Sequence, residues 1–273
     1  MIHLREDLKD AFTGNGAFEN ILCSRGEIFR EQKNRKTLRI THDGKGYFLK
    51  IHRKTGLGEI IKNLLQMKWP VVGAQNELRA IERLEEIGVK TMKVAGFGIR
   101  GIPPAWVDSF IITEEIENTV SLEDFCRNWP SNPPDFHLKL TLLCKIAGIM
   151  RCLHRNGINH RDCYICHFLL DPSSTENKQN YEDIILYIID LHRVQLRKRT
   201  PFRWIIKDLA GLYFSSMDIG LTERDLFRFM KSYSGKPLRK ILKEEQGFWN
   251  QVSRRAVSLY VKHFNRMPNM PHT

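Results

Sequence analysis

The segment NHRDCYICHFLL, residues 159–170, concentrates side chains that can do chemistry. Cys163 and Cys166 have the spacing of a redox pair or of half a zinc site, and with His167 they complete the C-x-x-C-H pattern of covalent haem attachment. Just before them stands Asp162, whose carboxylate is suited to general-base chemistry. These four possibilities need different surroundings, and the rest of the chain discriminates among them.

The other cysteines and the N-terminal segment favour the interpretation in which Asp162, and not the cysteine pair, does the chemistry. A structural zinc site usually takes a second closely spaced pair of ligands, and the remaining cysteines, at positions 23, 126, 144 and 152, form none. The N-terminal MIHLREDLKD lacks an apolar signal core, and no stretch approaches the roughly 18 apolar residues of a membrane span. We expect a cytoplasmic protein with free thiols, and neither structural zinc nor haem.

The composition is that of a globular protein with a basic surface. The 273 residues are 42% hydrophobic and 27% charged, which excludes a disordered tail. The 43 Lys and Arg exceed the 31 Asp and Glu and give a net charge of +12. Such a surface attracts nucleic acid, anionic lipid, phosphorylated substrates or acidic proteins, and charge alone does not choose among them.

The first half of the chain predicts an antiparallel sheet with helices. Alternating segments predict strands at 26–32, 37–44 and 47–53, with a hairpin turn at 43–46, and two further strands at 94–101 and 109–116. Apolar residues at helical spacing predict helices over 56–68 and 74–89, the second capped by Gly88.

The second half is mainly helical. Residues 121–135 resemble a turn-rich connector, 137–157 predict a long buried helix ending at Asn156-Gly157, and HFLLD with YIID predicts a small strand pair. The fold class is therefore α+β with two lobes: a strand-rich N-lobe over 1–117 and a helical C-lobe over 118–273, joined near Glu115 to Ser121.

Four motifs in order resemble the protein-kinase-like fold. Lys50 ends the strand YFLK, Glu77 opens the helix that follows, Asp162 stands in the HRD of a loop after the buried helix, and Asp190 ends the apolar run IILYIID. More narrowly, YFLKIHR, EIIKNLL, NELRAIERLEEIGV, NHRDCYICHFLL, IIDLHR and KDLAGLYFSSMDIGLTERDLFRFMKSY look like the lipopolysaccharide core heptose kinase family, from about Gly26 to Tyr233.

That resemblance implies transfer of phosphate from ATP to the first heptose of the lipopolysaccharide inner core, at the cytoplasmic face of a Gram-negative inner membrane. It implies that Asp162 accepts or orients the acceptor hydroxyl and that Asp190 holds Mg²⁺, with Mn²⁺ an alternative. Lys50 would neutralise phosphate charge while Glu77 fixes its side chain. Glu82 and Glu85 are alternative partners for that lysine.

The resemblance assigns further positions a supporting task. Residues 113–116, including Glu114 and Glu115, would edge the adenine pocket through backbone groups. His160 and Arg161 complete the catalytic-loop motif, and Asp208 in KDLAGLYF would brace that loop.

Three features depart from the pattern of protein kinases. His167 stands where those enzymes keep a metal-binding Asn, and it would either bind metal or orient Asp162. Tyr164 stands where many have Lys. The expected glycine-rich phosphate loop, sought around Arg25-Gly26-Glu27, has one glycine. The 17 residues between Asp190 and Asp208 leave no room for a long activation segment, which favours a small or glycan acceptor.

The segment HRVQLRKRTPFRW, residues 192–204, is the densest basic stretch. It is either a solvated charged face or an acceptor-binding surface for acidic sugars, phosphates or anionic headgroups. In the second case the binding residues would be Arg193, Arg197, Lys198, Arg199 and Arg203.

The partners expected are a lipid-linked lipopolysaccharide core acceptor, an anionic membrane surface and an acidic carrier protein, with no nucleic acid. Apolar C-terminal helices such as DLFRFMKSY either pack the lobe, which we favour, or hold an acyl chain. Two other functions stay open: a kinase of the same fold with a different sugar, metabolite or protein tyrosine as acceptor, or a catalytically silent binding protein.

Overall fold

A computed structural model describes the chain except residues 13–15, 33, 54–72, 103–105, 177–182 and 270–273. Contacts divide it into two compact units. The first comprises residues 1–86, 91–117 and 191–193, and the second comprises 87–90, 118–190 and 194–273. A single boundary after residue 117, as predicted, does not describe two short segments: residues 87–90 belong to the second unit and residues 191–193 to the first.

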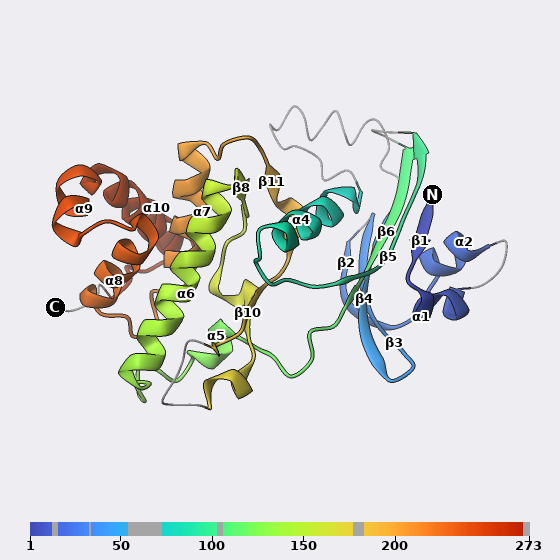
Figure 1. The fold of residues 1–273 in the computed structure, drawn as a ribbon, viewed down its shortest axis with the longest axis horizontal. Coiled ribbons are helices and arrows are strands. Elements are labelled where there is room, and N and C mark those ends of the chain that lie inside the picture. Colours follow the sequence, from blue (N-terminus) through green and yellow to red (C-terminus); the bar gives the residue numbers. More distant parts are fainter. Residues whose placement is uncertain (13–15, 33, 54–72, 103–105, 177–182, 270–273) are drawn as a thin grey trace. The chain divides into compact units, whose positions relative to one another are not determined.

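The first unit is built on a six-stranded antiparallel sheet of order β1-β5-β6-β4-β3-β2 (Figure 1). Its strands are β1 (Ile2–Leu4), β2 (Glu27–Gln32), β3 (Arg35–His42), β4 (Lys45–His52), β5 (Val94–Ile102) and β6 (Trp106–Glu114). The β3–β4 turn places Asp43 at φ 48° and Gly44 at φ 75°, the left-handed pair that a tight hairpin requires. The five strands predicted from the sequence are confirmed.

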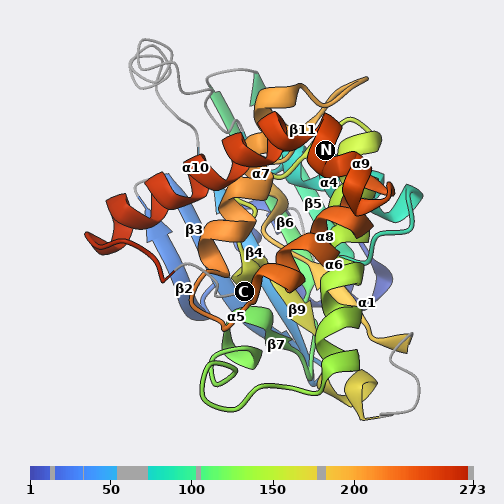
Figure 2. The ribbon, with the colours of Figure 1, turned by 90° about the vertical axis from the view of Figure 1, so that its left-hand side faces the viewer.

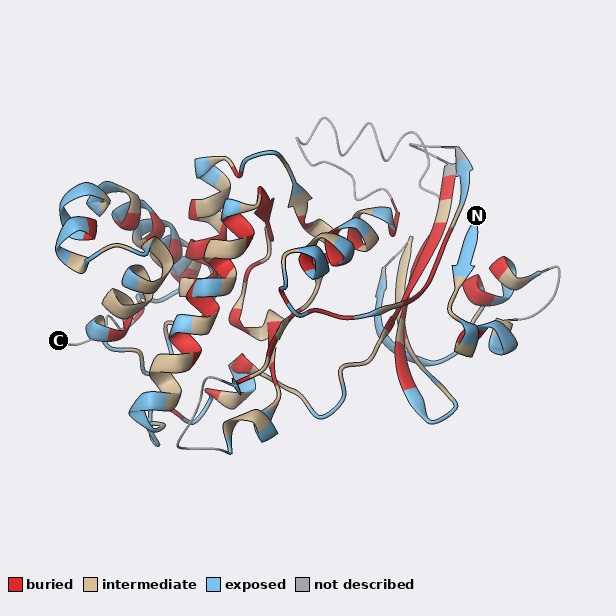
Figure 3. Ribbon diagram, in the orientation of Figure 1, coloured by how far each residue is buried: buried red, intermediate tan, exposed pale blue. Residues whose placement is uncertain are grey.

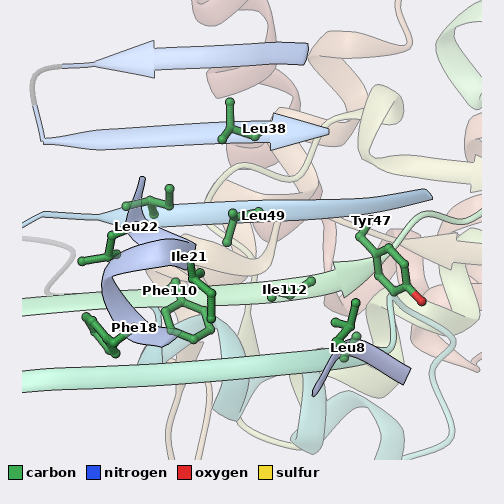
Figure 4. Close-up of a cluster of buried hydrophobic side chains, with 11 residues drawn as sticks. Leu8, Phe18, Ile21, Leu22, Leu38, Tyr47, Leu49, Phe110 and Ile112 are labelled. Atoms are coloured by element: carbon green, nitrogen blue, oxygen red, sulfur yellow. The ribbon is translucent and has the colours of Figure 1, made fainter. Parts of the chain in front are cut away.

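Short N-terminal helices cover one face of this sheet. They are α1 (Glu6–Lys9), the 3₁₀ turn η1 (Asp10–Phe12) and α2 (Ala17–Leu22). Figure 4 shows Leu8, Phe18 and Ile21 from these helices packed against sheet residues such as Leu49 and Phe110. Burial of this cluster explains why residues 4–12 and 16–22, too short and polar for a periodic signal, form regular structure.

Helix α4 (Gln75–Glu86) is amphipathic: Ala80, Ile81 and Leu84 are buried, and Gly88 follows at φ 74° as a left-handed cap. The helix predicted over 74–89 is thus confirmed with shorter ends. The helix predicted over 56–68 lies outside the described residues.

The second unit is mainly helical, with α5 (Leu122–Phe125), α6 (Phe136–Arg155), α7 (Phe202–Ser215), α8 (Glu223–Ser234), α9 (Leu238–Glu244) and α10 (Gln246–Phe264). Helix α10 packs on α7 and α8 packs on α6 (Figure 2). Its short strands are β7 (Val120–Ser121), β8 (Ile158–Asn159), β9 (Phe168–Leu170), β10 (Leu186–Ile188) and β11 (Gln195–Leu196), with 3₁₀ turns η2 (Ile165–His167) and η3 (Pro172–Thr175). A further 3₁₀ turn, η5 (Leu191–Arg193), belongs to the first unit.

Helix α6 forms where the sequence predicts a long buried helix. The Asp135 carboxylate accepts hydrogen bonds from the amides of His137 and Leu138, which caps its start, and Gly157 at φ 76° follows its end. Strands β9 and β10 pair antiparallel, as predicted for HFLLD and YIID. The connector predicted over 121–135 is wrong in its first part, because Ser121 caps the short helix α5 through a bond from the Asp124 amide.

No described helix has both the length and the apolar content needed to cross a membrane.

Candidate active site

In the first unit, Lys50 and Glu77 form a nearly buried ion pair. Lys50 lies on β4 and Glu77 in the first turn of α4, and the Lys50 Nζ to Glu77 Oε1 distance is 2.5 Å. Their side chains are 12% and 1% exposed, so little water screens the pair. Glu82 and Glu85, further along α4, are exposed. Of the three glutamates considered from the sequence, Glu77 is therefore the one that fixes Lys50.

Glu114 and Glu115, expected to edge the adenine pocket, are engaged by other parts of the same unit. Glu114 pairs with Arg5 at 2.6 Å, and Glu115 pairs with Arg39 at 2.8 Å. The Glu114 amide donates to the Lys93 carbonyl and the Glu115 amide to the Gly46 carbonyl, both at 2.9 Å. The backbone N–H groups of both glutamates are thus used within the unit. Sequence patterns gave no sign of Arg5 or Arg39, which come from distant segments.

Gly26, around which the phosphate loop was sought, does not lie in the turn that connects β2 to β3. It precedes β2, and a Cβ on this residue would lie 2.4 Å from the Arg39 carbonyl oxygen on β3. The glycine therefore permits close approach of two strands. The β2–β3 connection lies at the other end of the hairpin, after Gln32, and its sequence QKNR contains no glycine.

In the second unit, the loop 160–164 follows α6 and β8 and is held by Asp208 of α7. The Asp208 carboxylate accepts hydrogen bonds from the amides of His160 at 2.6 Å and Arg161 at 2.8 Å. Asp208 is 0% exposed, and α6 and α7 bury one face each in Figure 3. Arg161 adopts φ 75°, a conformation that costs about 1–2 kcal/mol outside glycine and that these bonds offset. The structure thus brings Asp208 to the loop that carries Asp162.

His160 is buried and neutral. Burial lowers its pKa. Its Nε2 lies 2.9 Å from the Ile189 carbonyl. A carbonyl only accepts, so Nε2 carries the proton. The ring stacks on that of His167 with centroids 5.7 Å apart, and it links the loop to the segment that leads into Asp190.

His167 lies between Asp162 and Asp190. Its Nδ1 is 2.7 Å from the Asp162 carbonyl oxygen, and its Nε2 is 3.6 Å from Asp190 Oδ2. Because a carbonyl only accepts, Nδ1 carries a proton and donates to it, so in the neutral form of the ring the lone pair would be on Nε2. Asp190 itself adopts φ 60°. Within the described ranges, no group of three or more His, Cys, Asp or Glu side chains is arranged to hold a metal ion by itself.

Cys163 and Cys166 are neutral thiols within the same segment. Burial raises the pKa of Cys163 well above its usual value, and its Sγ lies 3.5 Å from Met150 Sδ. Burial also raises the pKa of Cys166 to about 11. Neither sulfur is the thiolate that redox chemistry requires at neutral pH.

The basic residues of 192–204 are divided between the two units. Arg193 lies in η5 and groups with the first unit. In the second unit, Arg197 is half-buried while Lys198 and Arg199 are exposed. Sequence reasoning missed Trp204, whose ring lies beside Arg197. The sequence contained one signal for this residue: Arg203 and Lys207 stand one and three residues from Trp204 on helix α7, close enough for their side chains to reach its ring.

An apolar cavity of about 230 Å³ lies within the second unit. It is bounded by α5, α6, α7, α8 and α10. The lining residues include Trp129, Leu142, Ile146, Leu209, Leu212, Leu226, Phe229, Met230, Trp249 and Val252.

The family model of the lipopolysaccharide kinase (Kdo/WaaP) family matches residues 19–233. The chain belongs to this family. The expected phosphotransferase class of enzyme is thereby confirmed. The described structure and a solved relative confirm the expected α+β class and kinase-like fold.

Relatives extend the match to nearly the whole chain. Lipopolysaccharide core heptose(I) kinase WaaP of Escherichia coli K12 is 51% identical over 256 residues, covering 94% of this chain and 96% of the relative. The enzyme of the same name from Pseudomonas aeruginosa is 49% identical over 257 residues, covering 94% and 95%. A solved structure of WaaP in complex with acyl carrier protein superposes with a TM-score of 0.81 at 44% identity, over 95% of this chain and 99% of that chain.

Proposed function

We propose that this lipopolysaccharide kinase transfers the γ-phosphate of ATP to a hydroxyl of the first heptose of the lipopolysaccharide inner core. About half of its residues are identical to those of relatives that carry this activity in their names, over almost their full length. The observation that carries the proposal at the site is the loop 160–164. Asp162 lies at its centre, and Asp208 holds it by accepting hydrogen bonds from the amides of His160 and Arg161.

Asp162 is the proposed catalytic residue. It accepts, or at least orients, the proton of the attacking heptose hydroxyl, because phosphoryl transfer depends on positioning and charge compensation more than on covalent chemistry. Lys50 neutralises phosphate charge of the nucleotide, and Glu77 keeps the lysine side chain extended by their ion pair. His160, Arg161 and Asp208 position the loop.

A divalent cation, Mg²⁺ or Mn²⁺, fits the pair formed by Asp190 and His167. The carboxylate supplies the hard oxygen that Mg²⁺ prefers, and the Nε2 lone pair of His167 supplies a nitrogen that suits Mn²⁺ better. The bond from His167 Nδ1 to the Asp162 carbonyl fixes this tautomer. When bound, the cation would neutralise charge on the phosphates. The same bond also supports the alternative, in which His167 only orients the Asp162 segment.

We also propose an acidic carrier protein as a partner, with its acyl chain in the apolar cavity of the second unit. The support is the net charge of +12, the cavity of about 230 Å³ lined by apolar side chains, and the solved relative in complex with acyl carrier protein. Leu212→Trp should fill the cavity. In a binding titration it should lower the affinity for the acylated carrier protein more than the affinity for the unacylated one. Equal affinities of the wild type for both carrier forms would contradict the acyl assignment.

The acceptor is lipid-linked, so we propose that the protein acts as a peripheral protein at the cytoplasmic face of the inner membrane. Exposed cations such as Lys198 and Arg199 would contact anionic headgroups, at about 1 kcal/mol each near the surface. Co-sedimentation with anionic vesicles that weakens as salt is added tests this placement.

The function is tested by two measurements. Mass spectrometry of core oligosaccharide from cells lacking the protein should show loss of one phosphate. In vitro, Asp162→Asn should keep its fold and lose roughly two orders of magnitude in turnover with ATP and a heptose acceptor. An unchanged core phosphate content would refute the acceptor, and near-normal turnover of the variant would remove Asp162 from the mechanism.

A further inference from the structure

Four cationic side chains surround the ring of Trp204 in the second unit. The guanidinium carbons of Arg161, Arg203 and Arg197 lie 5.2, 5.4 and 5.8 Å from the ring centroid. The Lys207 Nζ lies 5.1 Å from it. These five residues, the Trp204 cluster, come from three segments: the loop before Asp162, the chain after β11, and the first turns of α7.

The cluster is attached to the loop that carries Asp162. Arg161 directly precedes Asp162 in the chain. Trp204 lies one helical turn before Asp208 on α7, and Asp208 accepts the amides of His160 and Arg161. The same helix therefore fixes both the backbone of the loop and the ring against which the Arg161 side chain packs.

Arg197 enters the cluster with its charge uncompensated. Its guanidinium donates to two neutral amide oxygens, Asn159 Oδ1 and Gln195 Oε1. Strand β11 reaches this position because Gly157, at φ 76°, has no Cβ; one would lie 1.8 Å from the Arg197 carbonyl oxygen. Among the described residues no carboxylate forms an ion pair with Arg197 or Arg203. Burial, followed by the charge of Arg203, lowers the pKa of Arg197.

An aromatic ring compensates such charges only in part. Each cation over a ring gains about 0.5–1 kcal/mol at exposed sites, less than a hydrogen-bonded ion pair gains. Helix α7 also begins here, after Pro201, without a side-chain cap, so its free amide groups add positive potential. The Trp204 indole Nε1 is buried and has no hydrogen-bond partner in the described structure. All three features favour an anion at this position.

Burial distinguishes a discrete anionic group from a flat membrane surface. Arg203 is exposed, but Arg161, Arg197, Trp204 and Lys207 are half-buried, whereas headgroups would first meet exposed cations such as Lys198 and Arg199. A compact planar carboxylate can approach guanidinium groups that a lipid surface cannot reach, and it can accept two hydrogen bonds from one arginine.

We propose that the Trp204 cluster is an acceptor subsite that binds the carboxylate of an acidic sugar linked to the phosphorylated heptose. This inference rests on the proposed heptose kinase activity. Anchoring a neighbouring sugar beside Asp162 would fix which hydroxyl faces the catalytic carboxylate, so the cluster would set acceptor specificity as well as affinity.

The test uses the full-length protein and a pair of acceptors: a heptosyl disaccharide whose second sugar carries a carboxylate, and its counterpart with that carboxylate reduced to an alcohol. The wild type should phosphorylate the carboxylate form with a KM roughly tenfold lower, the scale of one charge-assisted hydrogen bond. Arg203→Gln and Trp204→Phe should each reduce this preference severalfold, while the KM for ATP stays unchanged.

Arg254→Gln on α10 is the matched control, since it removes one exposed positive charge elsewhere in the same unit and should leave the preference intact. A preference that persists in both cluster variants, or a wild type that uses both acceptors equally, overturns the subsite. A wild type that phosphorylates neither acceptor instead refutes the proposed function. If Arg203→Gln weakens binding to anionic vesicles but not the carboxylate preference, the cluster contacts lipid and the proposal is wrong.

Discussion

The hydrogen bonds by which Asp208 holds the loop 160–164 can be tested by one substitution, Asp208→Asn. It keeps the shape of the side chain and removes its charge. In the structure the two carboxylate oxygens accept from two adjacent amides, those of His160 and Arg161. The amide side chain of asparagine offers one oxygen and one NH₂ group. One of the two loop amides would therefore face a donor, and no water reaches a residue that is 0% exposed.

The magnitude follows from these two bonds. A buried amide left without an acceptor costs about 1–3 kcal/mol, and the surviving bond loses its charge assistance, about 1 kcal/mol. We expect the free energy of unfolding of the second unit to fall by about 2–4 kcal/mol. For a unit of this size that corresponds to a fall in the thermal midpoint of roughly 5–15 °C.

The effect on activity should exceed the effect on folding at the assay temperature. Without the brace, Arg161 can leave its left-handed conformation, and Asp162 moves with it. Displacement of a reacting group by about 1 Å costs roughly 10²-fold in rate. The assay is kcat with saturating ATP and heptose acceptor, measured at a temperature where calorimetry shows the variant to be folded.

Asp218→Asn is the control, because Asp218 also accepts hydrogen bonds, from the Tyr260 hydroxyl and at 3.4 Å from the Arg266 guanidinium, but it is 45% exposed. It should lose less than about 1 kcal/mol and keep its kcat. If Asp208→Asn behaved like this control in both measurements, the reasoning from buried hydrogen bonds to loop position would be refuted.

Three further substitutions test other contacts. Glu77→Gln should raise the KM for ATP roughly tenfold, since Lys50 loses its charged partner; an unchanged KM would separate the ion pair from nucleotide binding. Burial, aided by the charges of Arg35, His192 and Lys50, lowers the pKa of His52 to about 3. The unfolded chain binds this proton below about 6.5, so stability should fall as pH drops from 6.5 toward 3, by about 2 kcal/mol at pH 5, and His52→Gln should flatten that loss in acid titrations of unfolding. His167→Asn should shift the Mn²⁺-to-Mg²⁺ activity ratio if His167 binds metal, or lower turnover at constant ratio if it only orients the loop.

Local patterns were sufficient to predict most of the sheet and the long helices. Strand β4 alternates in burial over its middle residues, α4 places its apolar residues on one face, and the Asp43-Gly44 turn has a residue pair typical of tight hairpins. The N-terminal helices escaped prediction because their order comes from packing on the sheet. Phe18 and Ile21 show no helical period long enough to detect, and they become informative only beside Phe110.

In the candidate site too, some residues could be predicted from local patterns and others could not. Motif order placed Lys50, Asp162 and Asp190 on the chain, since each stands at a fixed offset from a strand or a helix. The partners that occupy Glu114 and Glu115 could not be predicted, because Arg5 and Arg39 reach them from segments distant in sequence.

Arg161 and Asp190 have the largest positive φ angles of the described non-glycine residues, and both belong to the proposed site. Arg161 and Asp190 adopt φ 75° and 60°, where glycine would be the unstrained choice, and each such conformation costs on the order of 1–3 kcal/mol. The surrounding bonds supply the compensation: Asp208 holds the amide of Arg161, and the Ile189 amide donates to the His167 carbonyl just before Asp190. A glycine at either place would relieve strain but remove the guanidinium beside Trp204 or the carboxylate facing His167. At these two positions tertiary hydrogen bonds, which no local pattern encodes, hold the backbone in a conformation that local preference disfavours.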